Sequence, residues 1–193
     1  MIVWINGLFG AGKSTTAQRL ATRLNGARLF DPEEIGFGLP TWHGIGGDLD
    51  DFQHDPRWRT LTVEGVSAVE EQFGTAVVPM TLFIPQYFDE VVGGLRRAGH
   101  DLRHFTLRVG PDIALARGSG RTDGLVDWAL PRNQAYSACL TDQRFGVFID
   151  SESLGVDQVV DRIEDALVRP RWIGGSGAAV REVRHPDPYG NSG

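Results

Sequence analysis

The sequence has very little cysteine, since Cys139 is the one cysteine among 193 residues. A single thiol excludes an internal disulfide and is typical of proteins kept in a reducing compartment. Long apolar runs are missing too, and none reaches the roughly 18 residues of a membrane-spanning helix. The first residues lack the charged n-region, apolar h-region and cleavage site of a signal peptide. We therefore expect a cytoplasmic protein.

Net positive charge is also lacking, because the formal net charge at pH 7 is −6. A broad nucleic-acid-binding surface needs an excess of cations, so we expect no nucleic-acid partner. The five histidines have no metal-ligand spacing and no cysteine partners. The length suits one α/β domain with a real core. We expect this domain to cover residues 1–170, followed by a loosely ordered tail of Gly, Pro, Arg and Ser over 171–193.

Lysine is the scarcest cation, because Lys13 is the only lysine among the 19 lysine and arginine residues. It stands in the stretch Gly7-Leu8-Phe9-Gly10-Ala11-Gly12-Lys13-Ser14, which matches the phosphate-binding pattern G-x-x-x-x-G-K-[ST]. A genome that favours arginine codons explains the composition. A compact ammonium, however, enters a phosphate cradle where a forked guanidinium does not fit. The position of the lone lysine therefore favours a nucleotide site over a structural turn.

The flanking residues supply the structural context that this motif requires. Ile2 to Ile5 is a short apolar run typical of a buried parallel strand. After Ser14, apolar residues recur at helical spacing until Asn25-Gly26, a helix stop. Glycines let successive N–H groups face phosphate oxygens, and the helix dipole points at the same place. We predict that ATP is held by Gly7, Leu8, Phe9, Gly10, Ala11, Gly12, Lys13, Ser14 and Thr15.

Within this site, the motif assigns two roles to named side chains. Lys13 reaches the β- and γ-phosphates as a catalytic cation, and the Ser14 hydroxyl helps to hold Mg²⁺. A second Mg²⁺-holding group is expected as a carboxylate at the end of another strand. The predicted third strand, Thr75 to Leu82, ends in Met80 and Thr81 and has no carboxylate. This gap in the pattern directs attention to Asp31.

Asp31 follows a short predicted strand, Arg28 to Phe30, and precedes Pro32. It has two interpretations that are compatible with each other. As an N-cap it accepts from the backbone N–H of Glu33 or Glu34. As a carboxylate at the C-terminal edge of the sheet, it positions or deprotonates a substrate hydroxyl, or holds a water molecule bound to Mg²⁺.

The segment of about 35–58 is rich in Gly, Asp, His and Pro and shows little periodicity. A loop of this length is typical of a lid or a binding loop, and its rings argue against disorder. We expect this loop to form an apolar cover over a substrate. The alternative, that each aromatic ring packs into the core, is equally compatible with the sequence. The candidate substrate-binding residues are Asp31, Phe37, Phe52, Arg59 at the start of the next helix, and Thr81.

A second loop, about 117–130, contains two arginines around a glycine hinge. Arg117 and Arg121 flank Gly118-Ser119-Gly120, which suits a lid that closes on the transferring phosphate. The alternative is two solvated arginines. Arg132 and Gln134, in a helix expected to begin at Pro131, are further candidates. Strands are also predicted at His104 to Val109 and Phe145 to Asp150, and a closing amphipathic helix runs through Val156 to Leu167.

Several of these segments together resemble the bacterial tunicamycin-resistance ATP-binding proteins. The similarity covers roughly residues 1–168, and the residues that carry it, besides the P-loop, are Asp31-Pro32-Glu33, Gly36-Phe37, Asp51-Phe52-Gln53 with Pro56 and Trp58-Arg59, Val78 to Thr81, and His104 to Leu107. The resemblance implies a nucleoside-kinase-like P-loop fold with a parallel sheet of order 2-3-1-4-5 flanked by helices. It also implies ATP binding and protection against tunicamycin, a nucleoside antibiotic with a fatty-acyl tail. Membrane attachment through a C-terminal amphipathic helix is implied as well, but residues 171–193 lack helical periodicity.

Two functions of different class follow. The first is an ATP- and Mg²⁺-dependent phosphotransferase acting on a small nucleoside-like or sugar-nucleotide-like molecule. The second is ATP-dependent sequestration of the antibiotic without chemistry, which the missing strand-three carboxylate favours. A GTPase switch is disfavoured because no second lysine is present for a guanine-selective motif. The sequence indicates nothing about the oligomeric state.

Overall fold

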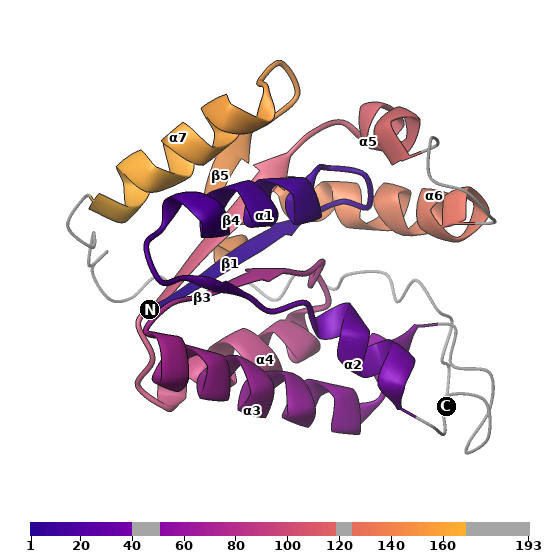
Figure 1. The fold of residues 1–193 in the computed structure, drawn as a ribbon. Coiled ribbons are helices and arrows are strands. Elements are labelled where there is room, and N and C mark those ends of the chain that lie inside the picture. The colour runs from indigo at the N-terminus through magenta and orange to yellow at the C-terminus, as the bar shows by residue number, and fades with distance from the viewer. Residues whose placement is uncertain (40–50, 119–124, 169–193) are drawn as a thin grey trace.

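A computed structural model describes residues 1–39, 51–118 and 125–168. Five parallel strands form one sheet in the order β2-β3-β1-β4-β5 (Figure 1). This order confirms the topology that the sequence resemblance implied. The strands are β1 (Ile2–Gly7), β2 (Arg28–Leu29), β3 (Ala76–Pro79), β4 (Leu102–Arg108) and β5 (Val147–Asp150).

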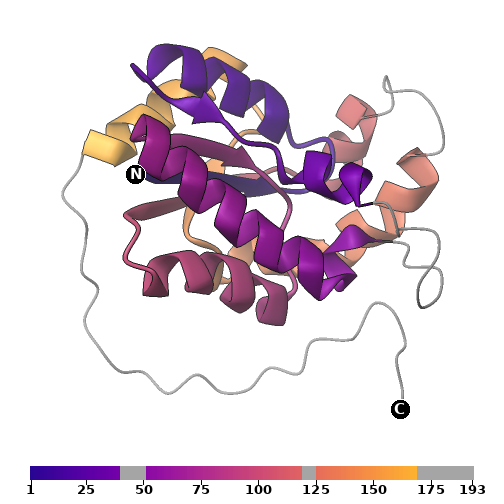
Figure 2. The same cartoon turned by 60° about the horizontal axis from the view of Figure 1, so that its bottom comes forward.

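Helices cover both faces of this sheet. The pair α1 and α7 packs on one face, and α3 and α4 pack on the other, with α2 beside α3 (Figure 1). Both views place α2, α5 and α6 at the end of the sheet where the strands finish (Figures 1 and 2). The helices are α1 (Lys13–Arg23), α2 (Pro32–Gly38), α3 (Pro56–Phe73), α4 (Pro85–Arg97), α5 (Pro111–Gly118), α6 (Leu125–Tyr136) and α7 (Val156–Val168).

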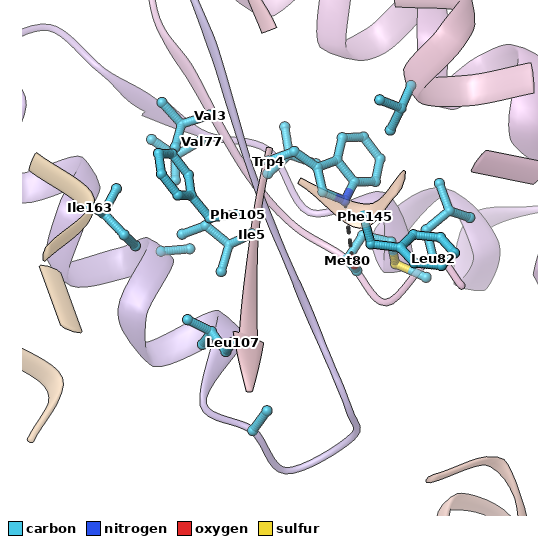
Figure 3. Close-up of a cluster of buried hydrophobic side chains, with 14 of the residues drawn as sticks. Val3, Trp4, Ile5, Val77, Met80, Leu82, Phe105, Leu107, Phe145 and Ile163 are labelled. Carbon is cyan, nitrogen blue, oxygen red and sulfur yellow. Dashed lines mark hydrogen bonds between the residues drawn. The ribbon is translucent and has the colours of Figure 1, made fainter. Parts of the chain in front are cut away.

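The central strand β1 is buried along its whole length, because it has a neighbouring strand on each side and helices above and below. Trp4 and Ile5 belong to a core that also contains Phe105, Leu107 and Phe145 (Figure 3). The buried Trp4 ring has a partner for its N–H group, since Nε1 donates to the carbonyl oxygen of Met80 at 3.2 Å (Figure 3). The continuous apolar run at the N-terminus therefore forms the buried parallel strand that it predicts.

The third strand is shorter than the predicted range of 75–82 and ends at Pro79. Beyond it the side chain of Asn6 takes the place of a neighbouring strand. Its Oδ1 accepts from the N–H of Leu82 at 2.9 Å, and its Nδ2 donates to the Leu82 carbonyl at 3.1 Å. A side-chain partner this distant in sequence leaves no trace in the local hydrophobic pattern.

Two further boundaries differ from the prediction. The helix expected to begin at Pro131 begins at Leu125 and contains Pro131 in its interior. The fifth strand begins at Val147, because Gln143–Phe145 form a 3₁₀ turn and Gly146 then has a φ of 83°. A side chain at Gly146 would lie 2.2 Å from the carbonyl oxygen of His104, so the turn requires glycine there.

Within the described ranges, no helix combines the length and the apolar content that crossing a lipid bilayer requires. The predicted tail over 171–193 and the central part of the first loop, 40–50, lie outside the described residues. The two-part division of the chain at residue 170 stays a prediction.

Candidate active site

The predicted phosphate-binding loop connects the buried β1 to α1, as its motif requires. The strand ends at Gly7 and the helix begins at Lys13, with Gly12 as a left-handed N-cap at φ 94°. Among the residues that the structure describes, no side chain caps this helix end. The first N–H groups of a helix have no acceptor within the helix, so they and the helix dipole are available to an anion. The local geometry therefore suits phosphate.

Two glycines of the loop have different surroundings. A Cβ at Gly10 would lie 1.9 Å from the carbonyl oxygen of Ala114, because α5 packs directly against the loop. A Cβ at Gly12 would meet no atom within 4 Å. Gly10 is thus required by packing, whereas the space beside Gly12 is open. An open space next to an uncapped helix N-terminus fits a phosphate group.

The single lysine lies across this loop. Lys13 is 8% exposed, and its Nζ donates to the carbonyl oxygen of Leu8 at 3.1 Å. The same nitrogen lies 5.3 Å from the centre of the Phe9 ring. The ammonium therefore rests on the loop carbonyl and an aromatic face, both of which favour a cation. Ser14 follows as the second, half-buried residue of α1.

The start of the loop is tied to the chain segment after β3. Asn6 Oδ1 accepts from the N–H of Gly7 at 2.9 Å, in addition to its bonds with Leu82. The hydroxyl of Thr81, which is 1% exposed, donates to the carbonyl oxygen of Gly7 at 2.8 Å. Thr81 thus holds the loop in place, and its predicted contact with a substrate stays a prediction.

The middle of the loop is held by a residue that sequence reasoning missed. Asn133 of α6 is fully buried, and its side chain forms two hydrogen bonds with the backbone of Phe9. The two residues lie 124 positions apart. An isolated asparagine carries no motif, so only the folded chain reveals this contact.

Asp31 follows β2 at the same end of the sheet and caps α2. Its Oδ1 accepts from the N–H of Glu33 at 3.0 Å, which confirms the N-cap interpretation. Within the described residues its other oxygen accepts no hydrogen bond. Across those same ranges no three metal-binding side chains converge. The catalytic and metal-binding roles of Asp31 stay predictions.

The two predicted rings contact each other and differ in exposure. Phe52 lies 5.2 Å from Trp58 between ring centres and covers Gly36, where a Cβ would meet its ring at 2.6 Å. Phe37 is 81% exposed and contacts the edge of Phe52 at 6.3 Å. Phe52 therefore packs against the core, and Phe37 is exposed to solvent. Their contact with a substrate stays a prediction.

Arg59 is buried at the start of α3, in contacts with other parts of the chain. Its guanidinium donates to the Gln53 carbonyl at 2.5 Å and to Glu90, and lies 4.2 Å from the centre of the Tyr87 ring. Burial raises the pKa of Glu90, but hydrogen bonds from Arg59 and Gln86 outweigh it, so the pKa is lowered overall. These contacts fix Arg59 structurally, and its role as a substrate ligand stays a prediction.

The predicted lid arginines are described only in part. Arg117 is at the end of α5, and its Nη2 donates to the carbonyl oxygens of Ser151 and Glu152 at 3.2 and 2.6 Å. It therefore joins α5 to the loop after β5. Arg121 lies outside the described residues. Closure of either arginine on a phosphate stays a prediction.

A buried ion pair connects the acceptor side of the site to α6. Asp51 is 2% exposed and Arg132 is 6% exposed, with 3.8 Å between Asp51 Oδ2 and Arg132 Nε. Arg132 precedes Asn133, which contacts the phosphate-binding loop. One turn of α6 thus touches both the predicted nucleotide side and the predicted acceptor side.

Comparison with known proteins identifies the fold. No family model matches the sequence, and a search of curated proteins finds no match either. The chain is similar to the tunicamycin resistance protein of Deinococcus radiodurans, with 27% identity and a TM-score of 0.70 over 86% of this chain and 94% of that one. This similarity confirms the resemblance predicted from the sequence.

Two kinases also share the architecture. A sugar kinase from Janibacter has 17% identity and a TM-score of 0.60, covering 86% of this chain and 93% of that one. A shikimate kinase from Bacteroides thetaiotaomicron has 18% identity and a TM-score of 0.58, covering 86% of this chain and 98% of that one. At these identities the likeness concerns the fold alone. The chain therefore has a kinase-like P-loop fold.

Proposed function

We propose that this chain binds ATP and Mg²⁺ and transfers the γ-phosphoryl group to a hydroxyl of a small nucleoside-like or sugar-nucleotide-like molecule, conferring resistance to tunicamycin. The observation that carries the proposal is the phosphate-binding loop. It combines an uncapped helix N-terminus, open space beside Gly12 and the amine of Lys13. Similarity to a tunicamycin resistance protein supports the substrate class.

On the nucleotide side, two side chains of the loop act in the proposal. Lys13 exchanges the Leu8 carbonyl for β- and γ-phosphate oxygens, which are stronger partners because they carry full charge. Ser14 offers its hydroxyl as a metal ligand. When bound, Mg²⁺ neutralises charge on the phosphate oxygens.

On the acceptor side, Asp31 has a carboxylate oxygen that is not used in capping α2. In the proposal that oxygen accepts the proton of the acceptor hydroxyl. The hydroxyl oxygen forms a bond to the γ-phosphorus, and the bond from that phosphorus to the β–γ bridging oxygen breaks, so that ADP leaves. Phe52 and the exposed Phe37 contact each other and offer apolar surface, which suits an acyl-bearing acceptor.

Arg117 and Arg121 are proposed to close on the transferring group. For this step Arg117 must leave the carbonyls of Ser151 and Glu152. Neutral carbonyl oxygens hold a guanidinium less tightly than phosphate oxygens do, so the exchange is favourable. We place the reaction in the cytoplasm, where ATP is available and the lone Cys139 stays reduced.

The direct test is a transfer assay with purified protein, γ-labelled ATP, Mg²⁺ and tunicamycin. We expect label in the antibiotic, and a rate lowered by about 100-fold or more in Lys13→Ala, since it removes a charge-stabilising donor. Asn25→Ala, an exposed change at the far end of α1, is the control. Nucleotide binding without transfer to tunicamycin or to simpler nucleosides and sugar nucleotides would refute the phosphotransferase proposal.

One observation favours a second function, ATP-dependent sequestration without chemistry. The chain after β3 presents Met80 and Thr81 where many P-loop proteins place an acidic metal ligand. Asp31→Asn discriminates between the two functions, because asparagine still caps α2 but accepts no proton. A kinase should lose resistance in cells that express this variant, whereas a binding protein should retain it.

A further inference from the structure

The two hydrogen bonds between Asn133 and Phe9 form a closed pair. Asn133 Oδ1 accepts from the N–H of Phe9 at 2.9 Å, and Asn133 Nδ2 donates to the carbonyl oxygen of Phe9 at 2.9 Å. Asn133 is fully buried on α6, which lies at the loop end of α1 (Figure 1). A primary amide is the side-chain group that offers a donor and an acceptor side by side. The match is therefore specific to asparagine at this distance.

The orientation of Phe9 matters because Phe9 is in the middle of the phosphate-binding loop. Its carbonyl oxygen carries a partial negative charge, which would repel phosphate if it turned into the cradle. Bonding to Asn133 holds that oxygen on the α6 side of the loop. The neighbouring Leu8 carbonyl is then left to accept from Lys13 and from the N–H of Ala11 at 3.0 Å. The amide of one distant residue thus fixes the direction of the Phe9 N–H and C=O groups within the loop.

We propose that Asn133 is a positioning residue of the nucleotide site, which acts through Phe9 to keep the loop in its phosphate-accepting form. This inference rests on the proposed function, because it presupposes that the loop binds a nucleotide. It adds that nucleotide affinity depends on α6, a helix more than 100 residues away in sequence from the motif. The dependence concerns the β- and γ-phosphates, which the backbone and the lysine of such a loop cradle together.

The experiment measures dissociation constants of ATP and AMP by calorimetry for wild type, Asn133→Ala, Asn133→Asp and the control Asn25→Ala. We expect Asn133→Ala to bind ATP roughly tenfold more weakly, because the N–H and C=O of Phe9 lose their hydrogen bonds with the Asn133 amide. AMP lacks the β- and γ-phosphates, so its affinity should change little and the ATP/AMP affinity ratio should fall. Asn25→Ala should leave both affinities unchanged.

Asn133→Asp has the shape of asparagine and keeps the acceptor for the Phe9 N–H. It replaces the donor by a charged oxygen opposite the Phe9 carbonyl, so it should weaken ATP binding more than Asn133→Ala. It also keeps the test available if the alanine variant does not fold, with circular dichroism verifying the fold of each protein.

The outcomes separate this inference from the proposed function. If wild-type protein binds no ATP, the proposed function fails and this inference fails with it. If wild type binds ATP and both Asn133 variants bind it equally well, only the positioning role is refuted. Equal weakening of ATP and AMP would also refute it, because that pattern indicates a general loss of structure.

Discussion

Asp51 and Arg132 bring two parts of the candidate site together as a buried pair of opposite charges, with 3.8 Å between Asp51 Oδ2 and Arg132 Nε. Asp51 also accepts from the N–H of Gln53 at 2.9 Å, at the start of a 3₁₀ turn over Phe52–His54. Arg132 is next to Asn133, the partner of the phosphate-binding loop. The pair therefore joins the chain segment of the predicted acceptor side to the helix that holds the loop.

Removing one member of this pair should destabilise the fold more than removing both. We expect Asp51→Asn, which keeps the cap on the 3₁₀ turn, and Arg132→Met each to lower the free energy of unfolding by about 3 kcal/mol, because each removes the opposite charge that lies 3.8 Å from the charge that stays buried. The double variant should recover part of this loss. Urea denaturation measures all four proteins. Additive losses would show that the two charges do not depend on each other.

Alanine substitutions at Gly10 and Gly12 should affect stability and ATP binding differently. Gly10→Ala places a Cβ 1.9 Å from the Ala114 carbonyl, so α5 must move and stability should fall, by about 2 kcal/mol or more. In Gly12→Ala the new Cβ meets no atom within 4 Å. The free energy of unfolding of that variant should fall only by the cost of a left-handed backbone at alanine, about 1–2 kcal/mol. Its ATP binding should nevertheless be lost.

Thermal unfolding with and without ATP separates these effects. The Gly12→Ala protein should show little stabilisation by ATP despite a moderate loss of melting temperature. Equal ATP stabilisation of wild type and Gly12→Ala would contradict the assignment of the open space to a phosphate group.

Lys13→Arg tests whether the lone lysine is needed for its shape as well as its charge. The Lys13 ammonium fits over the Leu8 carbonyl at 3.1 Å, next to the Phe9 ring. A planar guanidinium keeps the charge but is larger and less compact. We therefore expect ATP affinity to fall nearly as far as in Lys13→Ala, as calorimetry would measure. An arginine variant that binds ATP like wild type would show that charge alone suffices.

His104 should make the fold sensitive to mild acid. Burial lowers the pKa of His104 from 6.5 to about 3 in the folded protein, and its ring Nδ1 forms a hydrogen bond with the Phe145 carbonyl at 2.7 Å. The unfolded chain therefore binds the proton more readily between pH 6.5 and 3. Stability should fall as the pH decreases through this window, by about 1.4 kcal/mol per pH unit once well below 6.5.

The measurement is urea denaturation at pH 7 and pH 5. The carboxyl group of Glu70 should not contribute to the difference between pH 7 and pH 5. Its pKa is lowered by hydrogen bonds from the Met1 amine and His100, so the stability that the ionised carboxylate provides is lost only below about pH 4.5. His104→Asn keeps a donor near the position of Nδ1 and should remove most of the pH-dependent loss. The same slope in wild type and His104→Asn would show that another group is responsible.

Much of the fold, including the loop between β1 and α1, could be predicted from the sequence, because the signals there are local. The apolar run before Gly7, the glycine spacing and the helical periodicity after Ser14 predict strand, loop and helix in the observed order. Asp31 followed by Pro32 likewise predicts the observed N-cap. In each case the interacting residues are neighbours in the chain, so their spacing carries the information.

One of the boundary errors occurs where a distant residue replaces a local partner. The third strand was predicted too long because the Asn6 side chain, not a strand, pairs with Leu82. Pro131 was predicted to begin a helix and lies inside one instead. The lid role of Arg117 stays a prediction, and the structure shows its Nη2 on the carbonyls of Ser151 and Glu152.

The sequence by itself determined the phosphate-binding loop, since a run of glycines ending in Lys13 and Ser14 acts through backbone conformation within a few residues. Tertiary structure alone decided how that loop is held, because Asn133, Thr81 and Ala114 reach it from other elements. Hydrogen bonds and close packing depend on positions in space to within a fraction of an ångström. Such positions become defined only when the sheet and its helices have assembled.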